Sequence, residues 1–103
     1  MTRHGILCGG SLCIDVNKVL DRLPPAEHVA TILSETPDSG GPGFNMAVNL
    51  ALLGARFPLE LVGVIGDDDY GRLAQAICVR HGIGTAGLAT PARAEDAAEQ
   101  AGE

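Results

Sequence analysis

The sequence predicts an α/β protein built around a parallel sheet. Two apolar runs, at Gly5–Gly10 and Leu59–Gly66, have the composition of buried strands. Between them, a glycine-rich loop that begins at Ser39 opens into an almost wholly apolar helix, which ends near Gly54. A strand, a helix and a second strand in this order form a parallel unit with a right-handed crossover.

Length, charge and cysteine content narrow the classes of function. The chain has 103 residues, enough for one domain at most, and its net charge is −6 with no basic run. This balance argues against nucleic acid and anionic membranes as partners. The apolar stretch near the N-terminus is too short for a secretory signal, so we expect a cytoplasmic protein. Cys8, Cys13 and Cys78 form no CxxC pair, which favours reduced thiols over a disulfide framework or a zinc site.

A single carboxylate follows the first predicted strand. Asp15 lies in the mostly apolar stretch Ser11–Val16. Open α/β sheets bind ligands beyond the carboxyl ends of their strands, so this position favours a ligand contact. A turn or capping aspartate is the alternative.

The next segment predicts a hairpin-like pair of strands projecting from the main sheet. Extended segments at 17–22 and 29–35 flank the connection Leu23–Glu27, which cannot be helical at its two prolines. His28 is expected at an exposed strand end, because no second histidine or cysteine lies at metal-ligand spacing.

The glycine loop predicts a binding site at the start of the central helix. Gly40, Gly41 and Gly43 let a ligand approach the backbone, and the first amides of the helix have no partner within it. Asn45 adds a carboxamide that can donate and accept hydrogen bonds. A hydroxyl-rich or phosphorylated ligand would suit these groups. The alternative is a glycine turn into a core helix, without any ligand.

Three consecutive aspartates precede a second helix. One of Asp67, Asp68 and Asp69 is expected to cap this helix, a role that we favour over metal binding because adjacent carboxylates point in different directions. The helix is expected to end at Gly82, with His81 in its last turn.

These motifs together resemble a known family. The stretch Gly41–Gly54, followed by Val62–Gly71, resembles the N-terminal signature of the ribokinase-like (PfkB) carbohydrate kinases, and Gly9–Gly10 with Asp15 resembles their opening strand. The resemblance implies that residues 1–88 form the N-terminal part of a ribokinase-like three-layer fold, truncated, with the two segments of the hairpin as a small β lid.

The resemblance also implies a substrate and a set of contacts. Members of the family transfer the γ-phosphoryl group of ATP, with Mg²⁺, to a hydroxymethyl group of a sugar or nucleoside. Asp15 would then hydrogen-bond the sugar hydroxyls, the backbones of Gly41 and Gly43 would line the pocket, and Asn45 would contact the sugar from the helix start. In many members the lid also forms a dimer clasp, which implies a homodimer through the lid strands.

The chain departs from the family in several places. Cys13 stands where ribokinases have an asparagine, and Pro42 stands where they commonly have a lysine, so a sugar other than ribose, or a nucleoside, is expected. The Gly-Ala-Gly-Asp-type motif that supplies the catalytic aspartate, and the ATP site beside it, are absent from the sequence. No catalytic residue and no metal ligand are therefore assigned, and the chain alone is not expected to be a kinase.

The end of the chain differs in composition from the rest. Residues 89–103 are rich in alanine and glutamate without apolar periodicity, which predicts a divergent, disordered tail.

The first hypothesis for the function of the chain is an N-terminal substrate-binding fragment of a PfkB-type sugar kinase. The second is a non-catalytic interaction or dimerisation module built on the lid strands. A nucleotide- or phosphate-binding module on the Gly40–Asn45 loop is a third. A sheet cut after a few strands also predicts marginal stability and aggregation.

Overall fold

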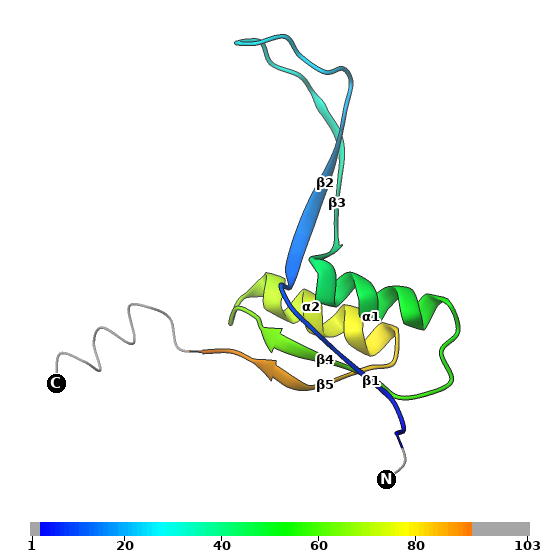
Figure 1. Cartoon of the computed structure of the whole chain (residues 1–103). Helices are drawn as coiled ribbons and strands as arrows, with labels where there is room; N and C mark the ends of the chain where they lie inside the picture. Colours follow the sequence, from blue (N-terminus) through cyan, green and yellow to red (C-terminus); the bar gives the residue numbers. More distant parts are fainter. Residues whose placement is uncertain (1–2, 92–103) are drawn as a thin grey trace, which may run out of the picture.

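The computed structural model describes residues 3–91, which form an α/β body and a long hairpin arm (Figure 1). This confirms the predicted class. Residues 92–103, most of the predicted tail, lie outside the described residues, and Ala89 is the last residue of a strand. In chain order the elements are β1 (Ile6–Gly9), β2 (Cys13–Leu20), β3 (Ile32–Gly40), α1 (Pro42–Leu52), β4 (Leu59–Val64), α2 (Asp69–Arg80) and β5 (Ile83–Ala89).

The body is a parallel sheet with the strand order β1-β4-β5. The arm and α1 connect β1 to β4, and α2 connects β4 to β5, so both connections are crossovers. Cys8 of β1 pairs with Leu61 of β4, and Leu59 of β4 pairs with Ile83 of β5. Among residues 3–91, no helix has the length and apolar character needed to cross a membrane.

The core lies between the sheet and the two helices, and it is largely aliphatic, as the composition predicts. Phe44 of α1, Leu61 of β4 and Cys78 of α2 are completely buried. No polar or charged residue among those described is buried. The buried residues that form the core cluster are Cys8, Phe44, Ala47, Leu59, Leu61, Ile65, Ala74, Ile77, Cys78 and Ile83.

The opposite face of the sheet is open within residues 3–91. Along β4 the buried residues Leu59 and Leu61 alternate with the exposed Glu60 and Val62. Leu7, which pairs with Glu60, is 64% exposed. The apolar run of β4 is typical of a strand covered on both faces, but only one face is covered in the described part of the chain. The described part of the chain therefore contains two of the three expected layers, the sheet and the helices that cover one of its faces.

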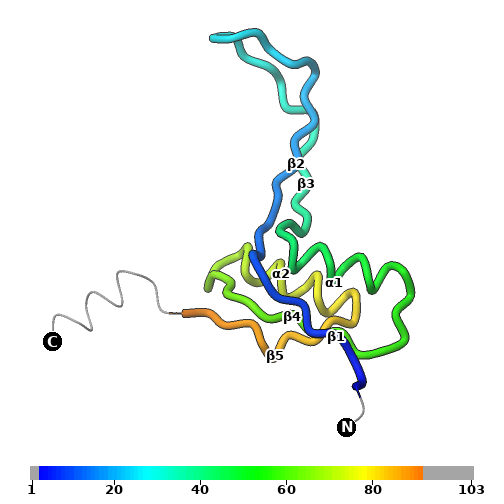
Figure 2. The backbone as a smooth tube through the Cα atoms, viewed as in Figure 1, coloured from blue at the N-terminus to red at the C-terminus, as the bar shows by residue number. Residues whose placement is uncertain are grey.

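The arm is an antiparallel hairpin that projects away from the sheet and the helices (Figure 2). The hairpin itself agrees with the sequence prediction, but its strands only partly overlap the predicted segments at 17–22 and 29–35. β2 begins earlier, at Cys13, and β3 runs from Ile32 to Gly40, directly into α1. The polar end of β3 has the composition of a loop, and its pairing with β2 is what makes it a strand.

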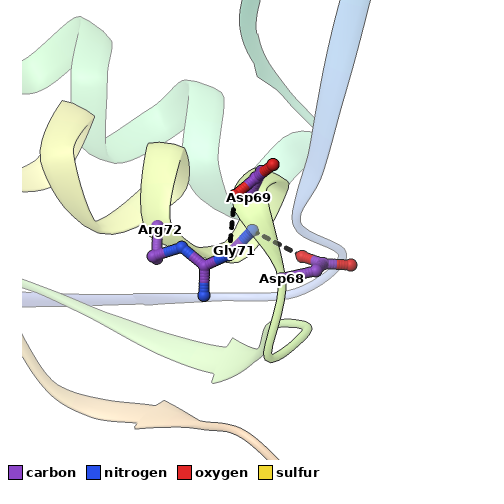
Figure 3. Close-up of polar contacts among 4 residues, drawn as sticks. All are labelled: Asp68, Asp69, Gly71 and Arg72. Carbon is purple, nitrogen blue, oxygen red and sulfur yellow. Dashed lines mark hydrogen bonds and ion pairs between the residues drawn. The ribbon is translucent and has the colours of Figure 1, made fainter.

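The first turn of α2 confirms the predicted cap (Figure 3). Asp68 is the N-cap residue, and its carboxylate accepts a hydrogen bond of 2.8 Å from the amide of Gly71. Asp69 instead accepts a hydrogen bond of 2.6 Å from the guanidinium of Arg72 at the surface. The helix ends at Arg80, so that His81 is its C-cap residue and does not lie in its last turn, and Gly82 follows with a φ of 69°, as expected for the end of a helix.

Replacing Asp68 with alanine is expected to destabilise the protein by about 1 kcal/mol, because the Gly71 amide loses its acceptor. Asp68→Asn keeps an oxygen acceptor at the same place, so it should retain most of the stability. The measurement is the free energy of unfolding from urea titrations of both variants. Equal losses in the two variants would contradict the capping role.

Candidate functional site

The predicted site residues lie where the arm joins the body. Asp15 is the third residue of β2, and Gly41, Gly43 and Asn45 lie at the junction of β3 with α1. β2 and β3 are paired here, so that Cys13 lies opposite the end of β3. The pairing brings the single carboxylate close to the glycine loop, although the two are more than twenty residues apart in the sequence.

The Asp15 carboxylate lies directly over Gly40. A Cβ atom at Gly40 would be 2.5 Å from the Oδ2 atom of Asp15, closer than carbon and oxygen atoms can approach. A side chain at this position would displace the carboxylate from where it lies. Asp15 itself is exposed, and among residues 3–91 its side chain has no hydrogen bond or ion pair within the protein. Its oxygens are therefore available to a ligand.

Two further glycines allow the loop to pack against the end of β1. Gly41 has a φ of 88°, and a Cβ atom there would overlap the carbonyl oxygen of Ser11. Gly43 is buried, and its Cα faces the backbone of Gly9, which a Cβ atom would approach to 2.7 Å. These close contacts place the first turn of α1 against the link between β1 and β2.

The N-terminus of α1 is an uncapped helix end. Gly41 is the N-cap residue, no side chain accepts a hydrogen bond from the first turn, and this turn contains no acidic residue. The amides of Gly43 and Phe44 therefore lack an acceptor within the helix, whereas the amide of Asn45 donates to Gly41 at 2.9 Å. The helix dipole adds partial positive charge at this end. The Asn45 side chain is exposed on the same turn.

Directly opposed residues in an antiparallel pair share a face of the sheet. In this register the residues on one face of the arm are mostly polar and those on the other are mostly apolar. Asp15 and Asn17 lie on the polar face, opposite Asp38 and Thr36. The other face carries apolar residues and one ion pair of 3.9 Å between Lys18 and Glu35. Its apolar residues are Ile14, Val16, Leu20, Ile32 and Pro37.

Asp38 is a candidate that the sequence analysis missed. It follows the segment predicted as a strand, and only the extension of β3 to Gly40 places it opposite Asp15. The alternation of polar residues at Ser34, Thr36 and Asp38 is a period-two signal that could have indicated a longer strand.

A cavity of about 140 Å³ lies next to these residues, at the carboxyl end of β4. Its walls include Cys13 and Ile14 of the arm, Phe44 of α1 and Tyr70 of α2. None of the four predicted site residues lines it. The predicted residues thus form an open surface beside this cavity, rather than its wall.

The three cysteines are free, as predicted for reduced thiols. Cys8 and Cys78 are buried in the core, and burial raises the pKa of the Cys78 thiol. Cys13 is exposed beside Gly41 at the root of the arm.

The fold and this site define a class of protein. A parallel α/β sheet whose first crossover carries a projecting hairpin, and then a glycine loop that starts a buried helix, is the arrangement expected for the N-terminal part of a ribokinase-like fold. Residues 3–98 match the pfkB family carbohydrate kinase, and the chain belongs to this family. The resemblance predicted from the motifs is thereby confirmed.

Individual relatives agree with this assignment. The chain is 36% identical over 83 residues to the ATP-dependent ribose-1-phosphate kinase of Halopiger xanaduensis, covering 81% of this chain and 27% of the relative. It is 43% identical over 79 residues to the bifunctional protein HldE of a Caulobacter species, covering 73% of this chain and 16% of that protein. The chain therefore spans about a quarter or less of the length of these relatives.

Solved structures show the same fold. The ribokinase of Thermotoga maritima superposes with a TM-score of 0.71 at 27% identity, over 87% of this chain and 29% of that one. The ribokinase of Cryptococcus neoformans in complex with ADP superposes with a TM-score of 0.63 at 30% identity, over 84% of this chain and 26% of that one. The predicted ribokinase-like fold is thus confirmed for the part that the chain spans.

Proposed function

We propose that this chain is the N-terminal substrate-binding part of a PfkB-type sugar kinase. In the intact enzyme, the γ-phosphoryl group of ATP passes to a hydroxymethyl group of a sugar or nucleoside, in the cytoplasm. The observation that carries the proposal is the unpartnered Asp15 carboxylate held over Gly40, beside the uncapped start of α1, in a chain of this family.

The groups at this site suit a ligand with several hydroxyls. The Asp15 carboxylate accepts hydrogen bonds from hydroxyl groups, while the partial positive charge at the uncapped start of α1 attracts hydroxyl oxygens. Asn45 can donate and accept hydrogen bonds. Because every hydroxyl is at once a donor and an acceptor, one polyol can use both kinds of group. Holding the acceptor sugar in one orientation is the contribution to phosphoryl transfer that these residues can make.

We place no ATP or Mg²⁺ site within this chain. Among residues 3–91 there is no group of three or more histidine, cysteine, aspartate or glutamate side chains that could hold a metal ion. We therefore assign no catalytic step to this chain. The catalytic base, ATP and Mg²⁺ are proposed to act from the part of the family fold that the chain does not span, so the chain alone should bind sugar without phosphorylating it.

Asp15→Asn is expected to weaken sugar binding at least tenfold, because hydrogen bonds to a charged acceptor contribute about 1.5–3 kcal/mol each. Calorimetric titration with a panel of sugars and nucleosides measures this, with and without the remaining portion of a related kinase added in trans. The matched control is Glu35→Gln, which removes a carboxylate from the opposite face of the arm. If no sugar or nucleoside binds under any condition, the proposal is refuted.

The arm supports a second candidate function, a dimerisation module. In the described residues β2 and β3 pair only with each other, so the outer edge of each strand is open. Open edges favour pairing with another chain. Light scattering tests this candidate, and a strict monomer at high micromolar concentration would count against it. Large apolar residues exposed along the arm are Val19, Leu20, Leu23, Val29, Ile32 and Leu33.

A further inference from the structure

We infer that Asp38 sets the charge selectivity of the sugar site, so that it takes neutral or amino sugars and rejects phosphorylated ones. This inference rests on the proposed function and adds a substrate class to it. It concerns a residue that no motif marks, and it follows from the strand register of the arm.

The first step is the position of Asp38. Asp15 and Asp38 are direct partners across β2 and β3, so their side chains lie on the same face of the arm. Directly opposed residues have Cβ atoms about 5 Å apart. A ligand that approaches the Asp15 carboxylate on this face therefore also comes near Asp38.

The second step is the balance of charge on this face. Positions 13, 15, 17 and 19 of β2 and positions 34, 36, 38 and 40 of β3 share it, and they include two carboxylates and no basic residue. Lys18, the basic residue of the paired strands, lies on the other face with Glu35. Two like charges that are directly opposed destabilise a strand pair, so this arrangement costs stability unless a ligand compensates it.

The third step is the chemistry of the ligand. Two adjacent carboxylates offer acceptors to a pair of hydroxyls or to an ammonium group. A phosphate group brought to the same face would meet two negative charges, which the partial charge at the start of α1 does not offset. The selected ligand is thus a polyol without phosphate, in contrast to the ligand in the name of the Halopiger relative, ribose 1-phosphate.

A structural role for Asp38 can be separated from this one. Its Oδ1 atom accepts a hydrogen bond of 2.7 Å from the amide of Ser39. Asp38→Asn preserves that acceptor and removes only the charge, so a purely structural role predicts unchanged selectivity. Glu35→Gln is the matched control, because it removes a charge from the same strand on the opposite face.

The experiment is calorimetric titration of the full chain and both variants with glucose, glucosamine and glucose 1-phosphate, and with ribose and ribose 1-phosphate. The original protein should bind the neutral and amino sugars more tightly than the phosphates. Asp38→Asn should shift the ratio of the dissociation constants about five- to tenfold in favour of the phosphates. Glu35→Gln should leave the ratio unchanged. An unchanged ratio in Asp38→Asn, or tighter binding of phosphates by the original protein, overturns the inference.

A second measurement tests, without any ligand, whether the carboxylates of Asp15 and Asp38 repel each other. Removing either carboxylate should raise the melting temperature at low salt, and removing both should add little to removing one, because the repulsion is then already gone. Fully additive effects overturn the inference. If the effects of the two substitutions are not additive but no probe sugar binds, the proposed function fails and the selectivity inference fails with it. If sugars bind but the effects of the two substitutions are additive, only the inference fails.

Discussion

Replacing Phe44 with alanine is expected to abolish cooperative folding of the protein. Phe44 is fully buried in the core of the body, where α1 packs on the sheet. Deleting a buried aromatic side chain typically costs about 3–5 kcal/mol, from lost burial and from the cavity that remains. Native domains have about 5–15 kcal/mol in total, and a sheet with one uncovered face should be near the lower end.

The measurement is a urea or thermal unfolding curve followed by circular dichroism. Met46, two positions further along α1 and 56% exposed, provides the matched control. Met46→Ala should change the free energy of unfolding by less than about 1 kcal/mol, because it removes little buried surface. Phe44→Leu should fall between the two, which covers the case in which the alanine variant does not fold at all. Equal effects at Phe44 and Met46 would show that α1 is not packed as described.

Marginal stability of the chain remains a prediction from the sequence, and the structure adds reasons for it. Leu7, Val62 and Val64 are exposed on the open face of the sheet. β1 and β5 are both edge strands in the described sheet. Exposed apolar faces and unpaired edges promote association with other chains. A large free energy of unfolding for the original protein, without aggregation, would contradict this prediction.

The elements that local chemistry specifies were predictable from the sequence. Asp68 caps α2 because an aspartate before a helix can accept a hydrogen bond from a first-turn amide. Gly54 and Gly82 follow the two helices with φ values of 83° and 69°, a conformation that glycine adopts without strain. The strands of the body were recognisable as apolar runs between turn signals.

The elements that depend on pairing between distant segments were not predictable in detail. The stretch from Ser34 to Gly40 is polar and glycine-containing, so its composition favours a loop. It is a strand because β2 lies beside it, and the register of two strands is a tertiary property. For this reason the sequence predicts a binding role for Asp15 but does not predict that Asp38 lies opposite it.

Replacing Gly41 with alanine is expected to disrupt the site and much of the fold. Gly41 has a φ of 88°, which costs an L-residue about 1–2 kcal/mol. The added methyl group would also overlap the carbonyl oxygen of Ser11, in the link between β1 and β2. The methyl group is fixed to the backbone and the carbonyl oxygen is part of it, so neither can easily move away from the other. Overpacking of this kind adds about 1–3 kcal/mol. We therefore expect a total loss of about 2–5 kcal/mol.

Gly54→Ala separates the two causes of that loss. Gly54 has nearly the same φ, 83°, but nothing lies within 4 Å of the position that its Cβ atom would take. Its substitution should therefore cost only the backbone strain, about 1–2 kcal/mol. The difference between the two variants in urea titrations measures the contact between the glycine loop and the link that leads to Asp15. If Gly41→Ala costs no more than Gly54→Ala, that contact does not hold the arm to the body. The Asp15 carboxylate would then have to be positioned by the β2–β3 pairing alone.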